Sequence, residues 1–182
     1  SIVILVCLVH LAFSQNFTSR AFSTDQGLPD TYIYSVLQDK EGFLWIATGK
    51  GLVKFDGQVF LRYNLHANEQ DDIIYAGAED KNKDLWFGTF SGKIYKLDRV
   101  RNRLKLYPKS IQGSVNKIIT SAFSNRIYFF SKGSGIYYLE KNRLEQITES
   151  QNYQINALEE IDGNNLLLAT SEGLLRLDVV KN

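Results

Sequence analysis

The chain has 182 residues, enough for one domain with a well-formed core. Its 21 basic and 20 acidic residues are scattered and nearly cancel, so the sequence carries no electrostatic signature of nucleic-acid or anionic-membrane binding. No Gly/Ser linker or low-complexity tract divides the chain, which predicts a single domain after the N-terminal segment.

Residues 1–14 are predicted to be the remnant of an export signal. The segment is apolar but too short to span a bilayer, and the small residues Ala12 and Ser14 suit cleavage before Gln15. A buried first strand is the alternative. A lipoprotein anchor at Cys7 is disfavoured because a valine precedes the cysteine, where that motif needs a small side chain.

Without this segment the chain contains no cysteine and one histidine, His66. This excludes disulfides, thiol catalysis, Cys-ligated zinc and iron–sulfur clusters, and it removes the usual general base. The segment 80–84 resembles the start of a calcium loop, but Leu85 stands at the sixth position instead of Gly, and Ser91 at the twelfth instead of Glu. We therefore expect no metal and no cofactor, and we interpret 80–84 as a turn.

Four short strands are predicted within the first forty residues or so after the N-terminal region. Their predicted ranges are 34–38, 43–48, 52–55 and 59–63. Turn residues separate them, including the hairpin dipeptide Asp56-Gly57. β-Branched and aromatic residues dominate these runs, and no helical period is present. The interval predicts one antiparallel four-stranded sheet.

The same pattern recurs three more times. The repeats are predicted at about 27–64, 72–108, 114–149 and 154–182. A hydroxyl residue marks each copy: Thr48, Thr89, Ser131 and Thr170, at spacings of 41, 42 and 39 residues. Such a period is typical of propeller blades. The predicted fold is therefore an all-β propeller of four-stranded antiparallel blades, with four blades visible.

Two further columns recur around the hydroxyl residue. Large residues precede it by three positions: Trp45, Trp86, Tyr128 and Leu167. Glycines follow it: Gly51, Gly92, Gly135 and Gly173. We expect the large residues to fill the space between sheets rather than to stack on sugars, and the glycines to adopt positive φ. We expect the hydroxyls to make hydrogen bonds within the blade, because no base recurs beside them.

The first copy, Gly27 to Tyr63, resembles the two-component regulator propeller repeat. The resemblance rests on Gly27, Leu28, Pro29, Asp39, Gly42, Leu44, Trp45, Ile46, Thr48, Gly51, Leu52, Phe55, Asp56 and Gly57. The second copy keeps Asp80, Leu85, Trp86, Gly88, Thr89, Gly92 and Asp98. The third and fourth copies keep the rhythm of strands and turns but lose the tryptophan.

This resemblance implies a periplasmic sensor region of a hybrid two-component histidine kinase. In that family the propellers precede a β-sandwich, a membrane helix, a kinase core, a receiver and a DNA-binding module. Residues 1–182 contain none of these parts, so we expect no enzymatic activity from the chain itself. Membrane attachment and contact with DNA would belong to those other parts, and a homodimer of the full-length protein is a further expectation.

The two ends are predicted to complement each other. The fourth copy lacks a fourth strand, whereas 16–23 precedes the first copy where an outer strand would stand, and pairing the two would complete the closing blade. Propellers of this family have more blades. We therefore expect the four repeats to be part of a larger propeller.

Ligand binding is predicted on one face of the propeller, where the loops between blades and those between second and third strands meet. The candidate residues on these loops are Asn64, His66, Asn68, Tyr107, Lys132 and Tyr153. Their polar and aromatic character suits an oligosaccharide. A scaffold for dimerisation or partner contacts is the alternative function. A propeller lyase or hydrolase is a third, disfavoured because the copies share no acid/base pair.

Overall fold

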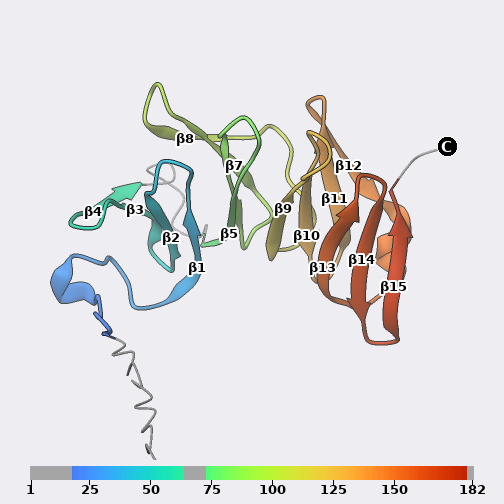
Figure 1. The fold of residues 1–182 in the computed structure, drawn as a ribbon, viewed down its shortest axis with the longest axis horizontal. Coiled ribbons are helices and arrows are strands. Elements are labelled where there is room, and N and C mark those ends of the chain that lie inside the picture. The colour runs from blue at the N-terminus through green and yellow to red at the C-terminus, as the bar shows by residue number, and fades with distance from the viewer. Residues whose placement is uncertain (1–17, 64–72, 180–182) are drawn as a thin grey trace, which may run out of the picture.

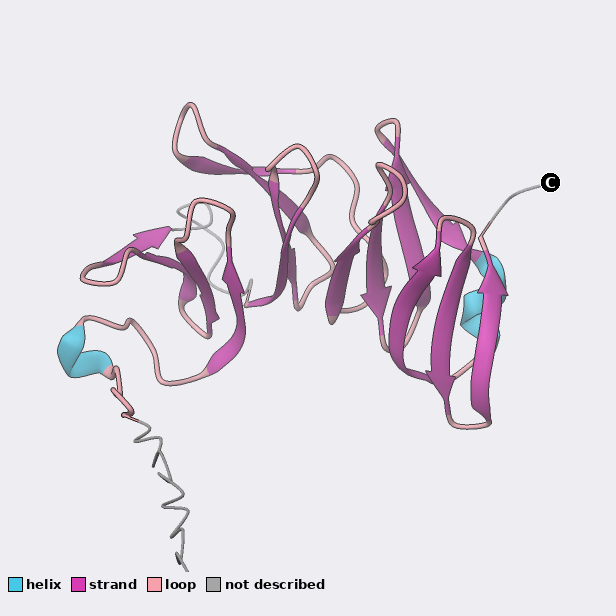
Figure 2. Ribbon diagram, viewed as in Figure 1, coloured by secondary structure: helices cyan, strands magenta, loops and turns pink. Residues whose placement is uncertain are grey.

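The computed structural model describes residues 18–63 and 73–179. These residues form antiparallel sheets joined by short turns, with two short 3-10 helices, η1 (Thr24–Gln26) and η2 (Thr148–Asn152) (Figure 2). None of the helices in these ranges has the length and apolar character needed to cross a bilayer. The predicted all-β class is confirmed.

Four sheets follow one another in chain order, which defines sheets 1 to 4 (Figure 1). Sheet 1 comprises β1 (Ile33–Gln38), β2 (Leu44–Thr48), β3 (Gly51–Phe55) and β4 (Phe60–Tyr63). Sheet 2 comprises β5 (Ile74–Glu79), β6 (Leu85–Thr89), β7 (Ile94–Asp98) and β8 (Arg103–Leu106). Sheet 3 comprises β9 (Lys117–Thr120), β10 (Ile127–Ser131), β11 (Gly135–Glu140) and β12 (Arg143–Ile147). Sheet 4 comprises β13 (Ile155–Asp162), β14 (Asn165–Thr170) and β15 (Gly173–Asp178).

Within every sheet each strand pairs with the next one along the chain. The first strands of successive sheets lie close together, as β1 with β5 and β5 with β9. The sheets thus stand side by side as propeller blades in an open arc (Figure 1). This arrangement confirms the predicted β-propeller and agrees with the expectation that it is part of a larger one.

The core lies between neighbouring sheets. Trp45 of sheet 1 is 2 % exposed and its ring lies 5.7 Å from that of Phe87 in sheet 2. Trp86 of sheet 2 packs in the same way against Phe129 of sheet 3, at 6.4 Å. In sheet 3, Tyr128 occupies this position and joins a buried cluster shared with sheet 4. The aromatic column therefore fills the space between blades, as predicted.

The turns that contain the glycine column also agree with the prediction made from the sequence. The four glycines of the column adopt positive φ, from 84° to 124°. At Gly92 a Cβ atom would lie 2.2 Å from the carbonyl oxygen of Ile111, so this position requires glycine sterically as well as conformationally. The hydroxyls of Thr48 and Thr170 donate to the carbonyls of Gly51 and Gly173, at 2.9 and 2.8 Å, and so close the hairpins.

The N-terminal segment differs from its prediction. Its described part, residues 18–23, forms no strand, and among the described residues sheet 4 has three strands. Phe22 instead packs against Phe55 and Phe60 of sheet 1, at 5.0 and 5.7 Å, and Leu28 is buried on the same side. This side of sheet 1 carries an apolar surface that faces away from sheet 2, and the segment covers part of it.

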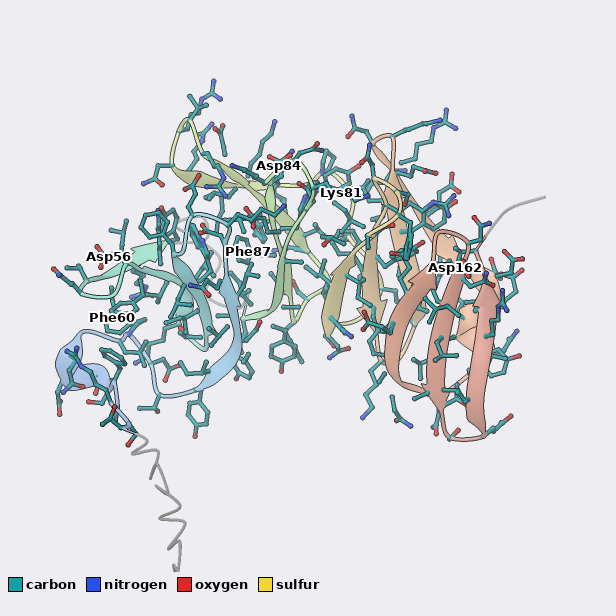
Figure 3. All side chains as sticks on the ribbon, in the orientation of Figure 1. Asp56, Phe60, Lys81, Asp84, Phe87 and Asp162 are labelled. Carbon is teal, nitrogen blue, oxygen red and sulfur yellow. The ribbon has the colours of Figure 1, made fainter. Side chains whose placement is uncertain are left out.

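The turns at the opposite ends of the strands are organised by acidic side chains. Asp80 Oδ1 accepts backbone N–H bonds from Asn82 and Asp84, at 2.8 and 2.9 Å. Asp162 does the same for Asn164 in sheet 4, at 2.8 Å. Figure 3 labels Lys81, Asp84 and Asp162 along this edge. The apparent calcium loop at 80–84 is therefore the turn between β5 and β6.

Candidate functional site

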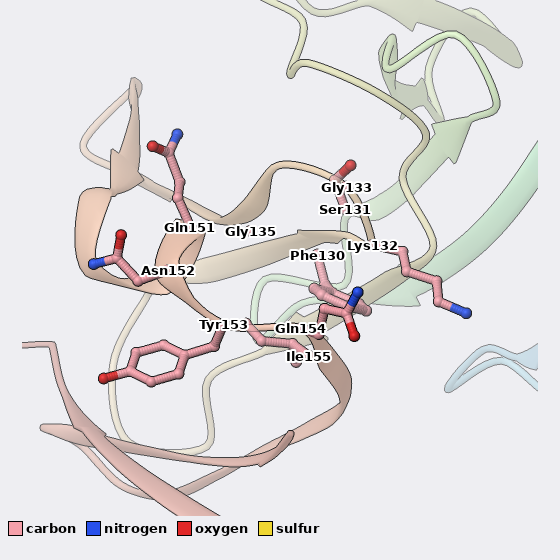
Figure 4. Close-up of a pocket in the computed structure, with 10 residues that line it drawn as sticks. All are labelled: Phe130, Ser131, Lys132, Gly133, Gly135, Gln151, Asn152, Tyr153, Gln154 and Ile155. Carbon is pink, nitrogen blue, oxygen red and sulfur yellow. The ribbon is translucent and has the colours of Figure 1, made fainter. Parts of the chain in front are cut away.

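A hollow of about 280 Å³ lies between sheets 3 and 4, on the face where the sequence predicted ligand binding. One side is the end of β10 with the turn that follows it, including Lys132 and Gly133. The other side is the end of η2 and the start of β13, from Gln151 to Ile155 (Figure 4). We call this hollow the loop-face pocket.

The two sides of the pocket are held together through a buried serine. Ser150 in η2 accepts a hydrogen bond from the backbone N–H of Ile136 at 2.8 Å and donates to the carbonyl of Ile147 at 2.5 Å. Gly135 allows this close approach, since a Cβ atom there would lie 2.5 Å from Ser150 Oγ. The backbone around the pocket is therefore fixed by the fold rather than by a ligand.

The turn that carries Lys132 is also anchored. The backbone N–H of Lys132 donates to Asn116 Oδ1 at 2.8 Å, and the backbone N–H of Asn116 donates to the carbonyl of Phe130 at 2.7 Å. Gln146 Nε2 donates to the carbonyl of Ser134 at 2.6 Å on the far side of the turn. The lysine side chain consequently projects from a rigid base, as Figure 4 shows.

The side chains that line the pocket are polar and largely neutral. Gln151, Asn152, Gln154 and Lys132 are exposed, and within the described ranges their side chains form no hydrogen bond or ion pair. Tyr153 is half-buried and its ring contributes to the apolar cluster between sheets 3 and 4. Among the described residues the lining thus offers several amide donors and acceptors, one cation, the aromatic rings of Phe130 and Tyr153, and no carboxylate.

This composition limits the chemistry available. None of the described residues that line the pocket is an Asp, Glu or His that could act as a general base. Among residues 18–63 and 73–179, no group of three His, Cys, Asp or Glu side chains is placed to hold a metal ion. The arrangement can bind a polar ligand through its amides and its lysine, and it supplies no acid/base pair.

The described part of the structure includes three of the six predicted site residues, and only two of these line the same pocket. Lys132 and Tyr153 both line the loop-face pocket, and their side chains point away from each other (Figure 4). Tyr107 lies elsewhere: its ring packs 6.0 Å from Trp86, and its hydroxyl donates to the carbonyl of Asn142 at 3.0 Å, so it links sheets 2 and 3. The other three predicted residues, Asn64, His66 and Asn68, lie outside the described residues.

Three pocket residues were not selected individually from the sequence. Gln151, Asn152 and Gln154 lie in a loop that was expected to face the ligand, yet their composition is ordinary for any surface loop. Only the position of η2 against β11 shows that they border a hollow. A polar cluster directly before the first strand of a repeat is the signal that could have identified them.

A larger hollow, of about 570 Å³, lies at the opposite ends of the strands between sheets 3 and 4. Three of its five charged side chains, those of Arg126, Glu140 and Glu145, already have partners. Arg126 Nε lies 3.4 Å from Glu140 Oε1, and Tyr138 donates to Glu145 at 2.7 Å. Because a ligand would have to displace these partners, the loop-face pocket is the better binding candidate.

Comparison with known protein families identifies part of the first blade. Residues 27–50 match the family described as two component regulator propeller. These residues are a two-component regulator propeller repeat. They include the Gly27-Leu28-Pro29 entry, the Asp39 turn and Trp45, so the residues that carried the resemblance are those that build the first blade.

A curated relative of this propeller repeat is histidine kinase P4 of Formosa agariphila, 36 % identical over 62 residues. The match covers 34 % of this chain and 4 % of the kinase. Among solved structures, the extracellular domain of a putative hybrid two-component system from B. thetaiotaomicron is similar, with a TM-score of 0.73 and 23 % identity. It covers 88 % of this chain and 25 % of that one, so the chain spans a small part of both relatives.

The same fold occurs in proteins of other function. A streptogramin B lyase structure is similar with a TM-score of 0.60 and 19 % identity, covering 85 % of this chain and 57 % of that one. At these identities the structural likeness establishes the propeller fold, and function must be argued from the site.

Proposed function

We propose that this chain belongs to the extracellular, periplasmic sensor region of a hybrid two-component signalling protein, and that its loop-face pocket binds an oligosaccharide. The family of the first repeat supports the signalling context. The fold supports it too, since extracellular domains of hybrid two-component systems share the propeller. Catalysis of phosphotransfer would belong to another part of such a protein.

The observation that carries the binding role is the set of polar side chains in the loop-face pocket that have no partner among the described residues. Three side-chain amides and one ammonium group border a hollow of about 280 Å³ whose backbone is already fixed by internal hydrogen bonds. Hydroxyl groups of a sugar can both donate to and accept from amides, and the half-buried ring of Tyr153 offers an apolar wall. The fixed backbone removes the cost of ordering the loops, whereas each exposed glutamine or lysine side chain still loses about 0.5–1.5 kcal/mol of rotamer freedom on binding.

Signalling would follow from a change in the relative position of domains. The pocket lies between two sheets, so a ligand that contacts both sides would favour one arrangement of sheets 3 and 4 over others. That preference would pass to whichever domain packs against the propeller. The size of the effect equals the difference in affinity of the ligand for the two arrangements.

The test is isothermal titration calorimetry of the chain against a panel of neutral and acidic oligosaccharides. We expect one class to bind, and the Lys132→Ala/Tyr153→Ala variant to bind that class at least about tenfold more weakly, or about 1.4 kcal/mol. Lys81→Ala is the matched control, because Lys81 is an exposed lysine at the opposite ends of the strands. Its affinity should equal that of the wild type.

Three outcomes would overturn the proposal. If no oligosaccharide binds, the chain acts as a scaffold or the ligand belongs to another class. If a glycan binds and the double variant binds it equally well, the loop-face pocket is not the binding site. If a glycan is cleaved during the titration, which chromatography of the recovered ligand would show, the propeller is an enzyme.

A further inference from the structure

Two tyrosines and a phenylalanine form a continuous row of rings on sheets 1 and 2. Tyr34 in β1 and Tyr75 in β5 have ring centroids 4.7 Å apart, and Tyr75 lies 5.6 Å from Phe90 in the turn between β6 and β7. Tyr34 is 42 % exposed and Phe90 is 55 % exposed. We call these three side chains the aromatic row. It lies on the loop face, because the Phe90 turn corresponds to the Lys132 turn of sheet 3.

Both tyrosines stand at a β-bulge. In sheet 1, Ile33 pairs with Thr48 and Ser35 pairs with Ala47, so Tyr34 is the extra residue. The same register shift in sheet 2 makes Tyr75 the extra residue between Ile74 and Ala76. A bulge leaves its extra residue out of the ladder and re-aims its side chain, which is why bulges accumulate beside binding sites.

The blade does not need an aromatic residue at this bulge. Sheet 4 has the same register shift between Ile155 and Ala157, and Asn156 is the extra residue there. In sheet 3 the corresponding residue is Asn116, which directly precedes β9. The position of Phe90, directly after the hydroxyl column, holds Lys132 in sheet 3 and Ser171 in sheet 4. The repeats thus fold with polar residues at every position of the aromatic row.

The core does not account for the aromatic row either. None of its three side chains belongs to the buried clusters between sheets, whereas Trp45, Phe87 and Tyr95 at other positions are at most 2 % exposed. Three rings held in contact at the surface leave apolar area in water that a ligand would cover. Their exposure is therefore unexplained by packing.

We propose that the aromatic row is a second carbohydrate-binding surface, on which the apolar face of a pyranose ring stacks. This inference rests on the proposed function and adds to it a site on different sheets. The chemistry of the row selects such a ligand: a sugar ring presents C–H groups on its face and hydroxyls at its edge. The rings of Tyr34 and Tyr75 likewise combine an apolar face with a polar hydroxyl.

The geometry of the three rings bears on whether a sugar ring or a cation fits the row. A cation-binding cage would require rings that surround the charge on several sides. Here Tyr75 contacts both other rings, tilted by 46° to Tyr34 and by 75° to Phe90, and no ring contact joins Tyr34 to Phe90, so the three rings do not close into a cage.

The repeats themselves provide the test variant. Tyr34→Asn/Tyr75→Asn/Phe90→Ser introduces the residues that sheet 4 already carries at these positions, so the blades should fold. We expect its affinity for the oligosaccharide bound by the wild type to fall at least about tenfold. The control is Phe123→Ser, which removes a ring that is 57 % exposed at the opposite ends of the strands. Phe90→Ser alone, in an exposed turn, should show a smaller loss in the same direction.

Saturation-transfer NMR gives a readout that a general loss of stability would not imitate. Irradiation of aromatic protons should transfer magnetisation to the C–H protons of the bound sugar in the wild type. Both tryptophans are buried, at 2 % and 5 % exposed, so the rings that a sugar can contact at the surface are those of tyrosine and phenylalanine. The triple variant should lose transfer to the sugar protons that stack on the row, whereas the Lys132→Ala/Tyr153→Ala variant should keep transfer to those protons.

The outcomes separate this inference from the proposed function. If the wild type binds no oligosaccharide, the proposed function fails and this inference fails with it. If the wild type binds and the triple variant binds equally well with unchanged transfer, only the aromatic row is refuted. If tetramethylammonium chloride binds the wild type and the triple variant loses that binding while glycan affinity is unchanged, the row is a cation site and the inference is wrong.

Discussion

The indole Nε1 of Trp45 donates a hydrogen bond to Oδ2 of Asp39 at 2.9 Å. The second blade repeats this bond between Trp86 and Asp80 at the same distance. One residue of each pair fills the space between blades, and the other organises the turn between the first and second strands. The bond therefore ties the packing of one blade against the next to the turn geometry at its edge.

Replacing Asp39 with alanine should strongly destabilise the chain. Asp39 is 4 % exposed, and its carboxylate also accepts the backbone N–H groups of Glu41 and Phe43, both at 3.0 Å. The change would leave three donors without their acceptor, one of them on buried Trp45. We expect a loss of ~2–4 kcal/mol in the free energy of urea unfolding. Asp25→Ala, at an exposed position, should change it by less than ~0.5 kcal/mol.

Two glycines with positive φ should respond differently to alanine. Gly92 and Gly57 have φ of 85° and 99°, so both substitutions strain the backbone. At Gly92 the new Cβ would also meet the carbonyl oxygens of Ile111 and Gly113, at 2.2 and 2.5 Å, whereas at Gly57 nothing lies within 4 Å. Thermal unfolding should show a loss of ~1 kcal/mol for Gly57→Ala and at least ~3 kcal/mol for Gly92→Ala. Equal losses would contradict the steric argument.

Adjacent glutamates in β13 should differ in their effect on the contact between sheets 3 and 4. Glu160 accepts hydrogen bonds from Ser121 Oγ at 2.7 Å and from the backbone N–H of Ala122 at 2.9 Å. Glu159, whose side chain is 70 % exposed, makes a surface ion pair with Lys117. Urea titration should therefore show a loss of ~1–3 kcal/mol for Glu160→Ala and less than ~1 kcal/mol for Glu159→Ala.

Stability should decline at acidic pH partly through two half-buried aspartates at strand ends, Asp98 and Asp162. The pKa of Asp162 is lowered by hydrogen bonds from the Asn165 side chain and the Asn164 backbone. The pKa of Asp98 is lowered by the backbone N–H and guanidinium of Arg101. A lowered folded-state pKa means that the stabilisation is present above the ordinary value of 3.8 and is lost as the pH falls through the lower folded value.

The corresponding measurement is the urea midpoint of the wild type and of the Asp98→Asn/Asp162→Asn variant between pH 7 and pH 2.5. Because the variant lacks both titrations, its midpoint should fall less steeply below about pH 4. If the plots of urea midpoint against pH for the two proteins stay parallel over this interval, these two carboxyls do not contribute to the loss of stability at acidic pH.

Local signals in the sequence predicted most of the fold. The four strands expected in the first repeat agree with β1 to β4 to within one residue at each end. Alternation of apolar residues and turn dipeptides such as Asp56-Gly57 act over a few residues, so they can be recognised without knowing the tertiary structure. The hairpin hydrogen bonds of Thr48 and the positive φ of Gly51 follow from the same local pattern.

The candidate site was predicted only in part, because burial depends on residues distant in the chain. Tyr107 and Tyr153 both stood in predicted loops, yet the first packs against Trp86 and only the second lines a pocket. The aromatic row could not be predicted from the sequence, because the pattern around Tyr34 is that of an ordinary strand. Its exposure follows from a bulge that is defined only by pairing with β2.

The sequence alone determined the period, the sheet composition of each blade and the residues that close its hairpins, since these depend on neighbours within about forty residues. The tertiary structure decided the position of the N-terminal segment, the meeting of η2 with the β10–β11 turn, and which aromatic rings remain in contact with water. Each of these is set by the packing of one sheet against another. The repeat is therefore encoded locally, and the surfaces proposed to bind a ligand arise from the way the repeats are placed together.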